Sequence, residues 1–130
     1  MLKFLLFINS IYLGLGSFFS FFVAPTLFRV LQKEQAGVVV ERVFPVYFSI
    51  GFMVSIITLM LGFKHSKLIF GLAFVNAFTH ALHIFYVLPT AHNLKMVDYQ
   101  AFMKWHGISM GMNLFSLFLT LIICILLMRR

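Results

Sequence analysis

The sequence predicts an all-α integral membrane protein, an up-down four-helix bundle formed by a single transmembrane domain over residues 1–130. Its composition is the first indication, because 62% of the residues are hydrophobic and only 10% are charged, whereas a soluble domain is nearer half apolar and a quarter charged. The mean hydropathy of +1.05 agrees. The second indication is that four uncharged stretches are long enough to cross a bilayer as helices. These stretches are residues 4–28, 46–63, 68–88 and 106–128.

The formal charge of +7 does not indicate a nucleic-acid-binding protein. The basic residues stand singly or in pairs between apolar spans, as topology determinants and lipid-phosphate contacts do. The single cysteine, Cys124, lies within an apolar span, and no paired-cysteine or zinc pattern is present. We therefore expect a lipid bilayer as the main partner and no nucleic acid.

The first span, residues 4–28, is longer than a straight crossing requires, so we expect Pro25 to kink or end the helix. Within this span Ser10, Gly14 and Ser17 recur at helical spacing. Such a stripe of small residues favours close packing against another helix.

The connections between the spans contain short helices and turns. Apolar positions in residues 29–42 recur at helical spacing, which predicts a short helix lying at the membrane interface in the first loop. We expect Phe44-Pro45 to break this pattern, a tight turn at Lys64–Lys67, and Pro89 to stop the third helix. Asp98 is expected to cap the last helix. No low-complexity tract or flexible linker is present, and we expect no internal repeat.

A polar stripe crosses the third span, which contains no charged residue. Asn76, His80 and His83 are spaced i, i+4 and i+7, and because lipid offers them no hydrogen-bond partners they should face protein or a water-filled cavity. The fourth span carries a second stripe at helical spacing, His106, Ser109, Met110 and Asn113. We predict that the two stripes, together with Arg29, line a ligand-binding pocket near the membrane face opposite the termini.

Three ligand chemistries fit such a pocket. Two histidines on facing helices, with Gly107 or Gly111 allowing close approach, are typical of haem ligation. Histidine with Met110 suits a soft metal such as Cu(I), and we take His83 and His106 as the candidate metal ligands. Histidines among amides and hydroxyls also relay protons or line a path for a small solute.

The alternative is that the histidines bond to one another or to backbone carbonyls and lock the bundle. His65 and His92 are interpreted as solvated loop residues.

No catalytic motif is evident. The sequence contains no glycine-rich phosphate loop, no carboxylate inside a span and no nucleophile motif, so we predict no catalytic residues. The favoured interpretation is a small membrane protein that binds or transports a metal ion, haem or a small solute. Because four helices make a thin wall for a permeation path, a transporter would be a homo-oligomer. The alternatives are a structural or partner-binding membrane protein and a haem-dependent redox protein.

Three blocks of the sequence resemble the transmembrane protein 205-like family. Phe22–Phe48 is similar to the family's first-loop signature, in which a Phe-Arg pair, a glycine and a Phe-Pro-x-Tyr-Phe stretch follow in that order. Phe102–Leu114 is similar to its His-Gly-x-Ser-x-x-x-Asn entry to the last helix. Leu88-Pro89 resembles its proline-containing exit from the third helix.

The resemblance implies a four-helix membrane protein and a cluster of signature residues near one membrane face. That cluster comprises Phe28, Arg29, Gly37, Phe44, Pro45, Tyr47, His106, Gly107, Ser109 and Asn113, and Pro25 lies within the same first block. The third helix departs from the animal pattern, in which His80 and His83 have no counterparts. These two histidines are therefore a property of this chain rather than of the family.

The distribution of basic residues is nearly equal on the two sides of the predicted bundle. Five lie with the termini and five lie on the opposite side, so the count of Lys and Arg does not decide the orientation. Lys3 beside the first span and the compact Lys64–Lys67 turn favour termini in the cytoplasm. For a bacterial protein this places the chain in the cell (inner) membrane.

Overall fold

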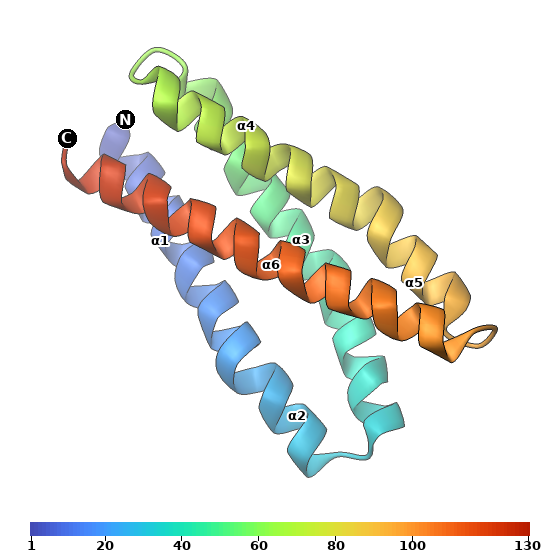
Figure 1. The fold of residues 1–130 in the computed structure, drawn as a ribbon. Coiled ribbons are helices and arrows are strands. Elements are labelled where there is room, and N and C mark those ends of the chain that lie inside the picture. Colours follow the sequence, from blue (N-terminus) through green and yellow to red (C-terminus); the bar gives the residue numbers. More distant parts are fainter.

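The structure, a computed structural model, describes residues 1–130 and consists of helices without strands (Figure 1). Four of its helical segments are long and apolar enough to cross a membrane. They run over Leu2–Val30, Lys33–Gly62, Lys67–Leu94 and Tyr99–Met128. The predicted helical membrane bundle is thus confirmed, and Asp98 caps the last helix as expected, its Oδ1 accepting a bond of 3.2 Å from the Ala101 amide.

Two of the four segments are interrupted by a wider, π-helical turn. The first consists of α1 (Leu2–Phe18), the π turn η1 (Phe19–Val23) and α2 (Ala24–Val30). The second is the uninterrupted helix α3 (Lys33–Gly62). The third consists of α4 (Lys67–Leu82), the π turn η2 (His83–Val87) and α5 (Leu88–Leu94), and the fourth is α6 (Tyr99–Met128).

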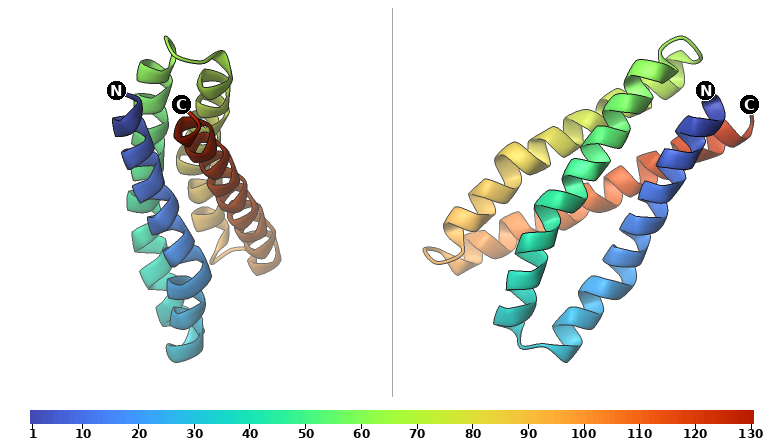
Figure 2. Two further views of the ribbon diagram at one scale, coloured as in Figure 1. Left: turned by 90° about the vertical axis from the view of Figure 1, so that its left-hand side faces the viewer. Right: turned by 180° about the vertical axis from the view of Figure 1, so that it is seen from behind.

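The helices form a ring in which α3 and α6 each pack against both α1 and α4. Every neighbouring pair is therefore antiparallel. Both termini and the α3–α4 turn lie at one end, which we call the terminal face, and the α2–α3 and α5–α6 connections lie at the other, the non-terminal face (Figure 1). At the non-terminal face the tips of the two hairpins diverge (Figure 2).

The distribution of side chains is that of a protein surrounded by lipid. Large apolar side chains point outwards, with Phe85 74%, Met60 71% and Phe21 68% exposed. Near the terminal face an apolar cluster closes the centre of the bundle. Its buried members are Leu5, Ile69, Ala73, Ile123 and Leu127.

The inward face of α1 differs from the predicted stripe of small residues. A Cβ at Gly14 would meet no other atom within 4 Å, so Gly14 faces outwards. The residues of α1 that are buried are Leu5, Asn9, Tyr12 and Gly16. The inward face of this helix thus combines one small residue, Gly16, with larger apolar, polar and aromatic side chains.

The expectation of a separate interfacial helix in the first loop is wrong. Helix α3 begins at Lys33 and continues through Phe44-Pro45 to Gly62 as one helix of 30 residues. Proline removes one backbone donor, whereas ending the helix there would leave several backbone groups without partners in an apolar environment. Continuing through Pro45 is the less costly solution.

The expectations that Pro25 ends the first helix and that Pro89 stops the third are also wrong, while the kink expected at Pro25 stays a prediction. Each proline directly follows a π turn, and the helix continues beyond it to Val30 or to Leu94. In these turns the amides of Ala24 and Leu88 bond to carbonyls five residues earlier. The wider turn changes the carbonyl pairing just where the proline ring would collide with the preceding turn.

The two π turns mark an internal repeat, contrary to expectation. Phe21–Thr26 reads FFVAPT and Phe85–Thr90 reads FYVLPT, identical at four of six positions and 64 residues apart. Each copy lies in the first helix of a hairpin, and both first helices start at the terminal face. The hairpins α1–α3 and α4–α6 therefore match in direction, in π turn and in proline.

Single cysteines test this topology. With Cys124 replaced by Ser, cysteines introduced at Lys3 and His65 should react with a membrane-impermeant maleimide from one side of sealed vesicles, and cysteines at Gln32 and Val97 from the other. A helix that ended at Pro45 without crossing would instead place Gln32 and His65 on the same side. That labelling pattern would contradict the four-span fold.

Candidate functional site

Buried polar side chains gather between α4 and α6. The predicted α4 stripe faces α6 there, but Ser109 is the one member of the predicted α6 stripe that bonds to it. Asn76 Nδ2 donates to Thr120 Oγ1 at 3.1 Å, and Ser116 Oγ donates to Asn76 Oδ1 at 2.6 Å. Ser116 Oγ also lies 2.8 Å from His80 Nε2. Each of the four residues is at most 2% exposed, so their hydrogen bonds are made within the bundle.

The donor and the acceptor of each hydrogen bond in this network can be assigned, because each hydroxyl has only one proton to donate. Thr120 gives its only hydroxyl proton to the Ser116 carbonyl at 2.9 Å, so its oxygen accepts from the Asn76 amide. This fixes Asn76 with Oδ1 towards Ser116, whose own single proton is used there. Ser116 Oγ must then accept from His80, and the hydrogen-bond network assigns the proton of the neutral imidazole to Nε2.

His80 Nδ1 is consequently a bare acceptor, and it has no partner in the bundle. The hydroxyl of Tyr12 is likewise buried and makes no hydrogen bond of good geometry, although the hydroxyls of Tyr47 and Ser116 are its neighbours. The two rings meet edge to face, with centroids 5.6 Å apart. A Cβ on Gly51 would lie 2.6 Å from both Tyr12 Oη and His80 Cε1. The rings of Tyr12 and His80 thus both pack against a position where only glycine fits, and each ring carries one buried polar atom without a partner. We call this position the Gly51 site.

A second polar group adjoins this site on the side of the non-terminal face. Tyr47 Oη donates to Asn113 Oδ1 at 2.8 Å, and Asn113 Nδ2 donates to Ser20 Oγ at 2.7 Å. The ring of Tyr47 stacks on that of Tyr12, with centroids 5.4 Å apart. A Cβ at Gly16 would collide with the Tyr47 hydroxyl, so this glycine allows α1 and α3 to approach.

His83 forms a third polar contact, with α6. Its Nε2 lies 2.5 Å from Ser109 Oγ, and its ring lies on Phe48, with centroids 3.8 Å apart. The Phe48 ring also approaches His80, at 6.3 Å. The two histidines of the stripe are therefore each bonded to a different serine of α6.

The structure does not bring His106 or Arg29 to these groups. His106 stacks on Phe102 of its own helix, with centroids 6.0 Å apart, and Arg29 is exposed. No group of three or more histidine, cysteine or acidic side chains is placed to hold a metal ion. The pairing of His83 with His106 as metal ligands stays a prediction.

The remaining signature residues are spread along the non-terminal half. Phe28 is 42% exposed, and Gly107 is exposed with open space beside it. Phe44 packs on Phe48, with centroids 5.2 Å apart. Gly37 faces Lys95, whose Nζ would lie 3.8 Å from an added Cβ.

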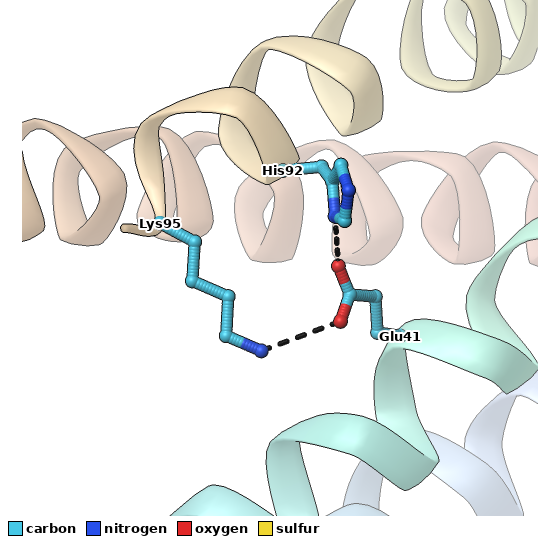
Figure 3. Close-up of polar contacts among 3 residues, drawn as sticks. All are labelled: Glu41, His92 and Lys95. Atoms are coloured by element: carbon cyan, nitrogen blue, oxygen red, sulfur yellow. Dashed lines mark hydrogen bonds and ion pairs between the residues drawn. The ribbon is translucent and has the colours of Figure 1, made fainter. Parts of the chain in front are cut away.

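An ion-pair cluster joins the two hairpins at the non-terminal face. Figure 3 shows the Glu41 carboxylate of α3 between His92, which lies on α5, and Lys95, which directly follows α5. Lys95 Nζ lies 3.3 Å from Glu41 Oε2, and His92 Nδ1 contacts Oε1. His92 is exposed, but it is a helix residue with a partner rather than a free loop residue. Because these groups are partly solvated, the pairs contribute only about 0–1 kcal/mol each.

Two cavities lie outside the polar groups around His80 and His83. The first, of about 150 Å³, is a crevice between α1 and α3 lined by Leu15, Phe19, Val43, Val46, Tyr47 and Ile50. The second, of about 610 Å³, opens at the terminal face. Neither His80 nor His83 lines either of them, because their surroundings are filled by side chains.

Sequence reasoning missed several members of the core network. Ser116 and Thr120 continue the α6 stripe from Asn113 at spacings of three and four, so the periodicity contained the signal. For Tyr12 and Gly51 the sequence contains no comparable signal. A tyrosine in an apolar span is usually an interfacial residue, and nothing in the sequence indicates which glycine faces it.

Comparison with known proteins places the chain in a family. Residues 7–100 match the model of a domain of unknown function, DUF4149. The chain belongs to the DUF4149 family. An uncharacterized protein of Aquifex aeolicus (strain VF5) is 54% identical over 112 residues, which cover 86% of this chain and 85% of that relative. No solved structure matches the chain.

The region that matches DUF4149 contains the first-loop block Phe22–Phe48 and the proline exit Leu88-Pro89. It ends before the block Phe102–Leu114. The resemblance to the transmembrane protein 205-like family therefore stays a prediction, while membership of DUF4149 is shown. The polar contacts between α4 and α6 join residues inside the matched region to residues beyond it.

Replacing Ser116 by Ala tests whether the hydrogen-bond network holds the bundle together. The change leaves Asn76 Oδ1 and His80 Nε2–H unpaired at once, so we expect a loss of about 1–3 kcal/mol in the free energy of unfolding. Denaturant titration of the protein in detergent micelles measures it. Ser49→Ala, at an exposed position of α3, is the control and should change stability by less than about 0.5 kcal/mol. Equal effects of the two changes would contradict the network.

Proposed function

We propose that this protein binds a small uncharged solute, one that both donates and accepts hydrogen bonds, at the Gly51 site, and exchanges it with the non-terminal face. The observation that carries this proposal is the unpartnered pair of Tyr12 Oη and His80 Nδ1. Polar groups that serve only to hold helices together are expected to be paired within the bundle. A buried polar atom without a partner costs about 1–3 kcal/mol, and a bound solute offsets that cost.

The distribution of polar residues supports access from the non-terminal face. On that side of the Gly51 site lie the hydroxyl and amide groups of Tyr47, Asn113 and Ser20 and the pair of His83 with Ser109. On the terminal side the bundle is closed by the apolar cluster around Leu5 and Ile123 described above. A solute leaving the site towards the non-terminal face therefore meets successive hydrogen-bonding partners.

Opening of the site requires the helices to move, because the side chains around Gly51 are in contact. The π turns η1 and η2 lie beside this region, one in each hairpin, and each is followed by a proline that weakens the helix. The proposed movement bends both hairpins at these turns and separates their tips. The ion pairs of Glu41 with His92 and Lys95 would hold the tips together in the closed state.

Cellular location and assembly belong to this proposal. The bacterial relative supports a cell-membrane location, and Lys3 with the compact Lys64–Lys67 turn supports termini in the cytoplasm. A four-helix wall is thin for a permeation path, so the transporting form is proposed to be a homo-oligomer. A transition metal or haem iron is an alternative ligand of a different class, and for it the predicted ligands are His83 and His106.

The second candidate function is that of a structural or partner-binding membrane protein. It is favoured by buried polar side chains whose hydrogen bonds are made entirely within the bundle. Asn9 Nδ2, for example, donates to Thr58 Oγ1 at 2.8 Å and to the Leu5 carbonyl at 2.9 Å. Such pairs hold α1 against α3 without any ligand. The two candidates differ in what they predict for Tyr12 and Gly51.

Gly51→Ala tests the binding site by filling it. The protein in liposomes should increase the permeability to at least one of water, ammonia, urea and glycerol, measured by stopped-flow light scattering or by the pH change for ammonia. We expect Gly51→Ala to remove most of that increase, because its Cβ would lie 2.6 Å from Tyr12 Oη and His80 Cε1 and would displace both side chains. A denaturant titration should show that the variant is still folded. Gly14→Ala adds the same methyl group at an open, outward position and should leave the permeability unchanged.

If the wild type leaves the permeability to all four solutes unchanged, transport of this class is contradicted. An absorption spectrum and elemental analysis of the purified protein then decide whether a metal or haem occupies the site instead.

Tyr12→Phe separates a binding site from a purely structural core. If a solute or water bonds to the hydroxyl in the membrane-embedded protein, its loss should lower the free energy of unfolding by about 1 kcal/mol. If the hydroxyl has no partner, removing it relieves a desolvation cost, and the variant should be at least as stable as the wild type. Denaturant titrations in lipid bicelles measure the difference, and the second result favours the structural candidate.

A further inference from the structure

The cavity at the terminal face combines apolar walls with a cationic rim. It has a volume of about 610 Å³ and lies where the start of α1, the α3–α4 turn and the end of α6 meet. Its walls are formed by Met1, Leu2, Leu6, Leu127 and Met128. Its polar lining residues are Lys3, His65 and Arg130. We call this cavity the terminal groove.

The charges around the terminal groove are not neutralised by the protein. Both ion pairs of the structure involve Glu41 at the opposite face, and the chain's other two acids, Glu34 and Asp98, also belong to the non-terminal end. The cations on the terminal side therefore have no acidic side chain as a partner. Arg130 is placed at the groove by a bond of 3.2 Å from its Nη1 to the carbonyl of His65.

The position of the groove makes a lipid a suitable occupant. The groove lies at the end of four membrane-spanning helices, at the level where headgroup phosphates meet the hydrocarbon region. A phosphate placed between Lys3 and Arg130 would receive charge-assisted hydrogen bonds. The apolar walls on either side then accept the glycerol backbone and the start of an acyl chain.

We propose that the terminal groove is a binding site for an anionic phospholipid, with Lys3 and Arg130 holding the phosphate. A zwitterionic lipid fits the apolar walls equally well, but its ammonium group adds a positive charge to a rim that has no acidic side chain. The site is thus selective for headgroups that carry net negative charge. It also favours the leaflet richer in anionic lipid for the terminal face. This proposal does not depend on the function proposed for the Gly51 site.

Native mass spectrometry of the full-length protein, stripped of lipid in detergent, tests the proposal. The probes are phosphatidylglycerol, phosphatidylcholine and inorganic phosphate at equal concentrations. We expect one phosphatidylglycerol to bind much more tightly than phosphatidylcholine. Since a hydrogen bond from a cation to the phosphate contributes about a tenfold factor or more, Lys3→Gln should weaken binding at least about tenfold and the double change Lys3→Gln, Arg130→Gln at least about a hundredfold.

The matched control is the double variant Lys64→Gln, Arg129→Gln. It removes the same charge from the same face, at residues that do not line the groove, and should retain binding within about twofold. Lys3→Arg with Arg130→Lys keeps the charges and should also bind.

Equal losses in the two charge-removing double variants would show only a diffuse surface attraction and would overturn the proposal. Equal binding of phosphatidylcholine, or competition by inorganic phosphate at the same concentration as the lipid, would overturn it too.

Discussion

The interior of a bilayer supplies no hydrogen-bond partners, and the core of this protein follows from that constraint. Every polar group that the spans carry into the membrane must be satisfied from within the bundle or be left at a cost. The bonds from Thr120 through Ser116 and Asn76 meet this requirement in a definite direction. Because each hydroxyl has one proton to donate, this series of hydrogen bonds ends at His80, and the lone pair of His80 Nδ1 has no partner in the bundle.

The same constraint explains why the helices are longer than the sequence alone suggests. A proline inside a membrane helix removes a single backbone bond, whereas a break there exposes several unpaired groups to lipid. The chain therefore runs through Pro25, Pro45 and Pro89, and at Pro25 and Pro89 it widens the preceding turn. The two widened turns occupy equivalent places in the two hairpins. Each hairpin therefore has one turn, just before a proline, where the regular α-helical hydrogen bonding is interrupted.

How much of this was predictable depends on the kind of signal. Four spans follow from hydropathy, and the facing stripes of α4 and α6 follow from helical periodicity, because both are properties of a single helix. The meeting of Tyr12, Gly51 and His80 joins three different helices. That contact depends on the rotation of α1 and α3 about their axes, which short-range patterns do not set. The repeat around Pro25 and Pro89 is present in the sequence as a six-residue match. The structure adds that each copy forms a π turn just before its proline.

The protein therefore combines satisfied polar pairs, which hold the helices in register, with one unsatisfied pair at the Gly51 site. The satisfied pairs, such as Asn9 with Thr58, account for a specific bundle in a solvent that provides no hydrophobic drive between helices. Thr26 Oγ1 is also buried without a partner, but the pair formed by Tyr12 and His80 is the feature on which the proposed binding function rests. Its existence depends on which nitrogen of His80 carries the proton.

The ¹⁵N chemical shifts of His80, measured by solid-state NMR on the protein in lipid bilayers, test this claim most directly. The hydrogen-bond chain predicts a neutral imidazole with the proton on Nε2 and with Nδ1 unprotonated, a pattern that Ser116→Ala should disturb. A proton on Nδ1, with Nε2 acting as the acceptor from Ser116, would reverse the chain. It would leave no acceptor facing Tyr12 and would contradict the account of the site.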